Sequence, residues 1–166
     1  LDSLNEMYCN VQQDIDTAMH FDRRLFEKTR EDEDFLHIYL GQGTIASSRP
    51  IDYKKQERLE VGDELTEMPE KIYQLFEHID GAPICSDMKD SNAIGIVGTK
   101  EALYGMFKNI VIDIAVRHYY GDVRLYMLVD DEKRYQWARF LPHLMNAGGI
   151  RNIVFDNESK NNIFES

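Results

Sequence analysis

The chain has 166 residues, of which 43% are hydrophobic and 30% are charged, values typical of one folded domain with a substantial core. The 19 lysines and arginines stand against 30 aspartates and glutamates, so the formal net charge is −11 at pH 7. A protein that grips phosphate backbones needs a basic face, and no cluster of lysine and arginine here is dense enough to build one. The composition therefore argues against disorder and against binding to nucleic acid or an anionic membrane.

Cysteine content and apolar runs exclude further classes. Cys9 and Cys85 are too few for a disulfide framework and lack the spacing of a zinc site, so we expect two free thiols. The most apolar run, residues 110–116, is shorter than the ~20 residues of a membrane span and contains Asp113, so we expect no membrane insertion by this segment. No secretory signal pattern is visible. Because the chain begins with Leu1 rather than Met, we expect a piece of a longer protein.

The first elements in chain order are a helix and a charged segment. Apolar residues recur every three or four positions over residues 4–19, which predicts an amphipathic helix. Residues 23–34 are dense in charges and are expected to form an exposed helix end and a loop. The acidic run at 31–34 lacks the alternating spacing and turn glycine of a calcium loop, so we interpret it as a solvated surface.

The next segment has the pattern of a small β region. Residues 35–40 alternate between two faces in the manner of a strand, and Gly41 and Gly43 are expected to end it. Two weaker extended candidates, 50–55 and 58–61, predict a small β elaboration.

A helix is expected after this β region. Apolar spacing over residues 65–79 predicts about four helical turns. The helix is expected to end at Asp80-Gly81, and Pro69 falls near its first turn, where a missing N–H costs little.

From residue 82 onward the predicted strands and helices alternate, which implies parallel strand pairing through right-handed crossovers. The expected strands cover 83–87, 93–97, 123–129 and 150–155. The expected helices cover 99–119, 132–145 and a last segment from 158 that the chain end cuts off. The fold class predicted from this order is α/β.

The most informative stretch for chemistry is the predicted turn between the strand at 93–97 and its helix. Gly95, Gly98, Thr99 and Lys100 stand there in an arrangement similar to a phosphate-binding loop. A working loop needs four residues between its glycines to wrap a phosphate, and here there are two. Glu101 also takes the position of the magnesium-holding hydroxyl. We therefore expect a degenerate phosphate loop that serves as a tight turn, with Thr99 as the helix N-cap.

Other residues carry weaker signals. Asp130 and Asp131 follow an apolar run in a manner that superficially resembles a Walker B strand, but they lie on the first strand after the candidate loop, where a catalytic role is not expected. His143 lies between apolar neighbours and is expected to be packed rather than to act as a base. The remaining histidines have no partner at catalytic or metal spacing. The sequence thus predicts no catalytic residue, no metal site and no bound cofactor.

Several segments together resemble a known family. Arg24-Leu-Phe-Glu-Lys28, followed by residues 34–43, resembles the R-L-W-E-R and D-F-L-x-x-R-L-G-x-G signature of the EssC/EccC membrane proteins of type VII secretion, which fall in the FtsK/SpoIIIE group. Phe26 replaces the signature tryptophan and Tyr39 its arginine. Further likenesses to FtsK-type motors follow in the same order at residues 94–103, 128–130, 141–144 and 154–156.

The resemblance implies a fold and a role. It implies a RecA/P-loop-like, mostly parallel sheet flanked by helices, after an N-terminal stalk helix and the small β elaboration. Residues 1–30 would be the stalk end and residues 31–166 a degenerate ATPase-like domain, truncated at its C-terminus. It would lie on the cytoplasmic side of the bacterial membrane and couple the membrane part to downstream ATPase modules during export of small helical proteins. Its implied partners are those modules, other secretion components and further copies of the parent in the assembly.

Two alternatives stay open at this point. One is a P-loop NTPase domain that retains ATP binding at Gly98, Thr99 and Lys100. The other is a free-standing α/β regulatory or small-molecule-binding protein with a pocket at the carboxyl ends of its strands.

Overall fold

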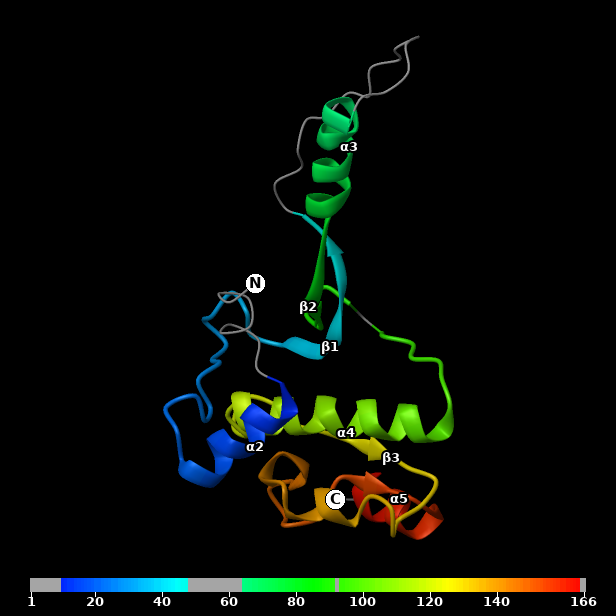
Figure 1. Cartoon of the computed structure of the whole chain (residues 1–166). Helices are drawn as coiled ribbons and strands as arrows, with labels where there is room; N and C mark the ends of the chain where they lie inside the picture. Colours follow the sequence, from blue (N-terminus) through cyan, green and yellow to red (C-terminus); the bar gives the residue numbers. More distant parts are fainter. Residues whose placement is uncertain (1–9, 48–63, 92, 165–166) are drawn as a thin grey trace.

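The structure is a computed structural model, which describes residues 10–47, 64–91 and 93–164 (Figure 1). Helices and small sheets alternate along these residues, so the predicted α/β class is confirmed. The elements are α2 (Val11–His20), β1 (His37–Ala46), α3 (Glu64–Glu77), β2 (His78–Asp87), α4 (Lys100–Arg117), β3 (Met127–Leu128), the short 3-10 helices η1 (Gln136–Phe140) and η2 (Pro142–Leu144), β4 (Ile153–Val154) and α5 (Asn157–Phe164).

Helix α2 matches the part of the predicted N-terminal helix that is described, and residues 1–9 lie outside the described ranges. It begins with a capping box, in which the Asn10 side chain accepts from the Gln13 N–H and the Gln13 side chain accepts from the Asn10 N–H. The predicted apolar face is not the buried one. Asp14 and Thr17 are the buried residues of α2, whereas Met19 is exposed, because the helix turns its polar side toward α4.

The hairpin of β1 and β2 corrects two expectations. Strand β1 does not end at Gly41 and Gly43 but continues to Ala46, with register shifts beside both glycines that let the pairing resume. The segment 83–87 was expected to join a parallel sheet, yet as part of β2 it pairs antiparallel with β1. Figure 1 shows this hairpin rising from the rest of the molecule, with α3 at its far end.

Helix α3 confirms the predicted helix, although Ile79 belongs to β2. Pro69 is the sixth residue of α3 and lies inside the helix rather than in its first turn. The extended candidates at 50–55 and 58–61 fall outside the described residues.

Helix α4 confirms the prediction for residues 99–119, and its C-terminal half supplies the buried side chains. The segment before it does not form the predicted buried strand. Residues 93–97 are irregular and Val97 is 99% exposed, because this segment pairs with no strand among the described residues. A run of apolar residues was thus a false indication of a buried strand.

The C-terminal part holds a small apolar core beneath α4. Strands β3 and β4 pair in parallel, as predicted, but each is two residues long and much shorter than expected. The helix predicted over 132–145 is wrong, because Pro142 begins a second short 3-10 helix in place of one continuous α-helix. The buried residues of this cluster are Met127, Ala138, Leu144 and Ile153, with Trp137 and Leu141 packed against them.

Two expectations about the fold gain no support from these elements. The described strands form two separate two-stranded sheets, so a RecA-like, mostly parallel sheet is not confirmed. A stalk helix is not confirmed either, since α2 is ten residues long. Within the ranges that the structure describes, no helix is both long and apolar enough to cross a membrane.

Candidate functional site

The residues predicted to form a degenerate phosphate loop lie at the N-terminus of α4 and in the turn before it. Thr99 caps the helix, as predicted, with its hydroxyl accepting from the Ala102 N–H at 3.3 Å. Neither Gly95 nor Gly98 has a positive φ. A side chain built at Gly95 would meet open space and one at Gly98 would make ordinary contacts, so no close backbone approach depends on either glycine. The turn therefore has no cradle of glycines around a phosphate-sized space.

Lys100 reaches a carboxylate in this structure. Its Nζ lies 3.3 Å from Oδ2 of Asp130, just beyond β3, and both side chains are largely exposed. The hydrogen bond from Lys100 lowers the pKa of Asp130. The structure thus brings together two residues that the sequence had singled out separately.

An open groove of about 540 Å³ lies at the carboxyl ends of β3 and β4. Asp130, Asp156, Asn157 and Lys160 provide its polar lining. The Asp156 carboxylate accepts from the Ser159 N–H at 2.8 Å, which lowers its pKa. Open α/β sheets bind ligands at this kind of edge, so the groove is the place where the alternative of a small-molecule-binding protein would put its ligand. Across the described residues, no group of three or more potential metal ligands occurs.

A second site, which the sequence did not predict, is a cluster of buried charges at the C-terminal end of α4. Its members are Asp14, Lys28, Asp113, Arg117 and His118, none of them more than 3% exposed. They come from α2, from the segment between α2 and β1, and from α4 and its end. Burying five polar or charged groups is costly unless each finds a partner, so the contacts inside this cluster define how the elements are joined. We call this set the buried charge cluster.

Lys28 connects three parts of the chain. Its backbone N–H donates to the Arg117 carbonyl at 2.9 Å, so the segment lies along the end of α4. Its Nζ donates to the His37 carbonyl of β1 at 2.8 Å and lies 3.4 Å from Oδ2 of Asp34. One lysine therefore holds the base of the hairpin against α4.

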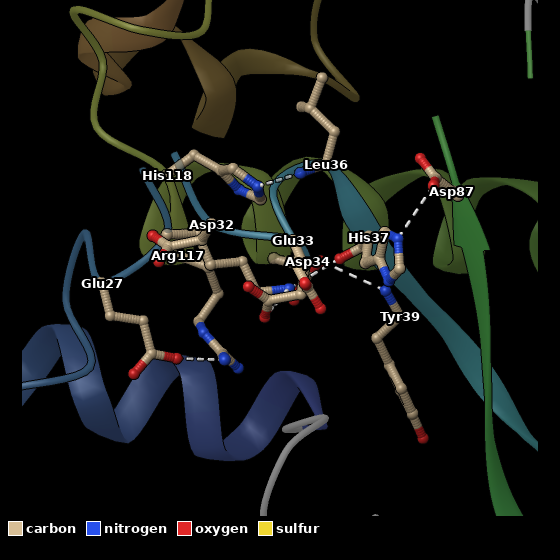
Figure 2. Close-up of polar contacts among 12 residues, drawn as sticks. Glu27, Asp32, Glu33, Asp34, Leu36, His37, Tyr39, Asp87, Arg117 and His118 are labelled. Carbon is tan, nitrogen blue, oxygen red and sulfur yellow. Dashed lines mark hydrogen bonds and ion pairs between the residues drawn. The ribbon is translucent and has the colours of Figure 1, made fainter. Parts of the chain in front are cut away.

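Side chains of α4 and of the residue that follows it make the remaining contacts of the cluster. Oδ2 of Asp113 accepts from the Tyr39 N–H at 3.3 Å, and Nε2 of His118 accepts from the Leu36 N–H at 3.0 Å. Arg117 forms an ion pair with Glu27, as Figure 2 shows. The C-terminal end of α4 thus contacts Leu36 and Tyr39, at the start of the hairpin, through side chain to backbone bonds. It contacts Glu27, in the segment between α2 and β1, through an ion pair.

Burial sets the protonation of the cluster. Desolvation, followed by the charge of Asp113, raises the pKa of Asp14 to about 7, although Arg117 and Lys28 act in the opposite direction. Desolvation also raises the pKa of Asp113 to about 6 and lowers that of His118 to about 4. His118 is therefore neutral at pH 7, which fits its role as acceptor from Leu36.

Sequence reasoning missed this cluster for identifiable reasons. Asp14 lay on the side of the first helix that was expected to face water, and Lys28 lay in a segment interpreted as exposed. The available signal was Asp113, a carboxylate inside the most apolar run of the chain. His143, by contrast, is packed as predicted: it is fully buried and one ring nitrogen lies 2.8 Å from the His118 carbonyl. Cys85 is a free thiol, as predicted, and burial raises its pKa to about 11.

Comparison with known proteins identifies relatives of the whole chain. No protein-family model matches it. The type VII secretion system protein EssC of Staphylococcus aureus (strain MSSA476) is 29% identical over 167 residues, which cover 99% of this chain and 11% of EssC. The ESX secretion system protein EccC of Geobacillus thermodenitrificans (strain NG80-2) is 26% identical over 154 residues, which cover 90% of this chain and 10% of EccC. The chain is a homologue of EssC and EccC.

This homology confirms the resemblance recognised in the sequence motifs. The chain spans about a tenth of the length of the EssC and EccC relatives it matches. The motif segments that suggested EssC/EccC now have a structural place. Glu27 and Lys28 of the first motif contact the end of α4, and Asp34, Leu36 and Tyr39 of the second supply further contacts to the same cluster.

Proposed function

We propose that this EssC/EccC homologue is a non-catalytic coupling domain of a bacterial type VII secretion ATPase. In this role it links the membrane part of the parent protein to downstream ATPase modules on the cytoplasmic side. Its partners are those modules, other membrane components of the secretion system and neighbouring copies of the parent, and the exported cargo consists of small helical proteins. The observation that carries the proposal is the buried charge cluster, whose hydrogen bonds and ion pair join the base of the hairpin and the segment before it to α4.

The mechanical part of the proposal follows from the kind of contacts involved. Three side chain bonds of the cluster reach backbone atoms at the start of the hairpin, those of Leu36, His37 and Tyr39. The bonds from Phe26 and Lys28 to α4 are backbone to backbone, at 2.8 and 2.9 Å. A displacement of α4 along its axis would break several of these bonds at once. A domain held in this way transmits a displacement of one element to the others instead of absorbing it in a loop.

The domain division of the proposal is 1–30 as the end of a stalk and 31–166 as a degenerate FtsK/SpoIIIE-type ATPase-like domain. The parallel pair β3–β4 beneath α4 would be the part of a RecA-like layer that this segment contributes. The direct contact of Lys28 with β1 supports treating the segment before the hairpin as the link between the two parts.

We further propose that the domain itself does not hydrolyse ATP. Three features support this: the short spacing between Gly95 and Gly98, the lack of a close backbone approach at either glycine, and the use of Thr99 as a helix cap. The alternative, residual ATP binding at Gly98, Thr99 and Lys100, is favoured by one observation, the closeness of Lys100 to Asp130 at the edge of β3.

Calorimetric titration distinguishes these two possibilities. We expect no saturable binding of Mg-ATP at concentrations up to about 1 mM, the range of weak ligands. Lys89→Ala is the matched control, because Lys89 is an exposed lysine whose Nζ lies beside Asp32, Glu33 and Phe35. Saturable binding in the micromolar range that is lost in Lys100→Ala but kept in Lys89→Ala would establish the nucleotide-binding alternative.

Secretion by cells that carry the parent protein tests the coupling role directly. We expect Lys28→Met to reduce export of the secreted proteins at least about tenfold, because it opens the joint between β1 and α4. Lys100→Ala is expected to leave export near the wild-type level. Parent protein amounts are measured in the membrane fraction, so that loss of export is compared at equal abundance. Normal export by Lys28→Met at wild-type abundance would contradict the coupling role.

A further inference from the structure

A cavity of about 290 Å³ lies between η1, the turn that precedes β4 and the start of α5. Four of its lining side chains are aliphatic or aromatic: Tyr135, Ile150, Ile153 and Phe155. The cavity is distinct from the open groove at the carboxyl ends of β3 and β4, although Phe155 lines both. None of the described residues that line it belongs to the buried charge cluster.

The inner wall of this cavity is fixed by packing. Ile153 is 7% exposed and belongs to the apolar core beneath α4. The ring of Tyr135 packs edge-on against the rings of Tyr104 and Phe107 of α4, with centroids 5.4 and 5.6 Å away. Edge-to-face contacts of this kind are a favoured arrangement of aromatic rings and hold the ring in one orientation. The apolar wall is therefore preformed, as in most small-molecule sites.

Two arginines and one glutamate provide the charged lining of the cavity. Arg139 lies in η1 and Arg151 lies two residues before β4. Nε of Arg151 donates to the Arg139 carbonyl at 2.6 Å, which holds the Arg151 side chain against the end of η1. Among the described lining residues, Glu132 is the only carboxylate. The lining thus carries a net positive charge in a chain whose formal net charge is −11.

This positive charge is only weakly neutralised by the protein. Nη1 of Arg139 lies 3.8 Å from Oε1 of Glu132, at the outer limit of an ion pair, and the two side chains are 48% and 42% exposed. Exposed ion pairs contribute little to stability. In the ranges that the structure describes, Arg151 forms no ion pair. An anionic ligand would therefore meet both guanidinium groups without breaking a strong ion pair.

The chemistry of the lining selects the class of ligand. A guanidinium group presents a planar fork of N–H donors that matches a carboxylate or a phosphate. Small-molecule sites combine a mainly apolar lining with a few polar groups, and about 290 Å³ is at the lower end of their volume range. The lining therefore fits a small molecule with one compact apolar body and one acidic group.

A neighbouring hollow helps to place the apolar body. It has a volume of about 330 Å³, shares Arg139 and Arg151 with the cavity and is also lined by Gln136 and Phe140. Phe140 is the only apolar side chain among its described lining residues and is 84% exposed. The apolar body therefore belongs in the cavity, with the acidic group at the two shared arginines.

We propose that this cavity binds a small organic anion. Its apolar body contacts Tyr135, Ile150 and Phe155, and its carboxylate or phosphate contacts Arg139 and Arg151. The inference goes beyond the coupling role, which rests on other residues. Its failure would leave the buried charge cluster unaffected.

Three naphthalene derivatives with the same two-ring body provide the probe. 2-Naphthoate carries a carboxylate, 2-naphthyl phosphate carries a phosphate, and 2-naphthamide is neutral. Two-dimensional ¹H–¹⁵N NMR measures their binding to the full 166-residue chain and identifies the residues whose signals shift. We expect at least one anion to bind at least about tenfold more tightly than the amide. The tighter anion then identifies the acidic group.

Charge variants test the role of the arginines. Arg151→Gln is expected to weaken binding of the tighter anion at least about fivefold and to leave the amide unchanged. Glu132→Gln is expected to strengthen binding of that anion, because it removes the negative charge of the described lining. Arg23→Gln is the matched control, because Arg23 is an exposed arginine that does not line the cavity.

Apolar variants locate the two-ring body. Ile150→Ala is expected to weaken binding of all three probes at least about threefold, because it removes part of the apolar wall. Leu128→Ala is the control, since Leu128 is 78% exposed and lines the groove at the carboxyl ends of β3 and β4 instead. Circular dichroism checks the fold of each variant. If Ile150→Ala is not folded, the shifted signals of the wild-type chain locate the probes.

Four results would overturn the proposal. Absence of binding by both anions up to about 5 mM would show that the cavity takes no such ligand. Equal affinities for the anions and the amide would show that the arginines do not select charge. A preference for the anion that persists in both Arg151→Gln and Arg139→Gln would place the acidic group elsewhere. Binding that is lost in Leu128→Ala and kept in Ile150→Ala would assign the ligand to the groove.

Discussion

Replacing Lys28 by methionine is expected to lower the free energy of unfolding by about 3–5 kcal/mol, the range found when one partner of a buried ionic group is removed. Methionine fills similar space but carries no charge. The change would leave the His37 carbonyl without the Lys28 donor and would remove a positive charge beside the buried Asp113. Because Lys28 favours the ionised form of Asp113, we expect the loss to be larger at pH 8 than at pH 5.

Urea denaturation followed by circular dichroism measures this loss. Lys89→Met is the matched control: Lys89 is exposed, its Nζ makes long contacts, at 3.4 and 3.5 Å, to carbonyls of the charged segment, and it lies 5.7 Å from the centre of the Phe35 ring. That control is expected to change the free energy of unfolding by less than about 1 kcal/mol. Equal losses in both variants would mean that the buried charge cluster does not hold the elements together.

Replacing Asp14 by asparagine is expected to change the pH dependence of stability. The pKa of Asp14 is about 7 in the folded protein, whereas an unfolded aspartate has its ordinary value of 3.8. Between these values the folded state binds more protons than the unfolded state, so the contribution of Asp14 to stability is present below pH 4 and is lost as the pH rises through 7. Asparagine does not titrate, so Asp14→Asn should gain about 2–4 kcal/mol relative to wild type between pH 4.5 and pH 8.

Urea unfolding curves at several pH values test this expectation. The pKa of Asp113 is also raised in the folded protein, to about 6. Its contribution to the free energy of unfolding therefore also falls as the pH rises, but over a narrower pH range than that of Asp14. His118 acts in the opposite direction: its folded pKa is about 4, so stability rises with pH between about 4 and its ordinary value of 6.5. Both groups are present in wild type and variant, so their effects largely cancel in the comparison. Asp16→Asn, an exposed position on the same helix, is the control. Stability curves that stay parallel for Asp14→Asn and wild type would show that Asp14 is ionised in the fold.

The sequence predicted best where local pattern and local structure agree. Helix α4 has a cap residue, Thr99, and a long apolar run, and the structure has both where expected. The parallel direction of β3 and β4 followed from the order of elements along the chain, because a crossover connection largely fixes it. The packing of His143 followed from its apolar neighbours.

The wrong predictions concern segments whose structure depends on a strand partner or on tertiary contacts. Apolar residues at 93–97 suggested a buried strand, but a strand needs a neighbour, and periodicity cannot show whether one exists. Likewise the pairing of β2 with β1 joins segments about forty residues apart in the chain, which no local pattern encodes. The helix expected over 132–145 is replaced by two short 3-10 helices, and Phe140 at the end of η1 is 84% exposed.

In the candidate site, too, local features could be predicted from the sequence and long-range contacts could not. The two-residue spacing between Gly95 and Gly98 could be read from the sequence alone. The buried charge cluster could not be predicted, because Asp14 and Asp113 are about a hundred residues apart and only the fold brings them near Lys28 and Arg117. The one local signal of the cluster in the sequence was Asp113, a charged residue inside an apolar run.

Helix α4 places the two regions discussed above at opposite ends of one rod. Its 18 residues span about 27 Å at 1.5 Å per residue, with the turn at Thr99 at one end and Arg117 at the other. The middle of this rod is a regular helix without proline, so it resists both stretching and bending. A ligand or neighbouring module that pushes on the exposed end would therefore shift the buried end by a similar distance. The base of the hairpin would move with the buried end of α4 even though it is far from the point of contact.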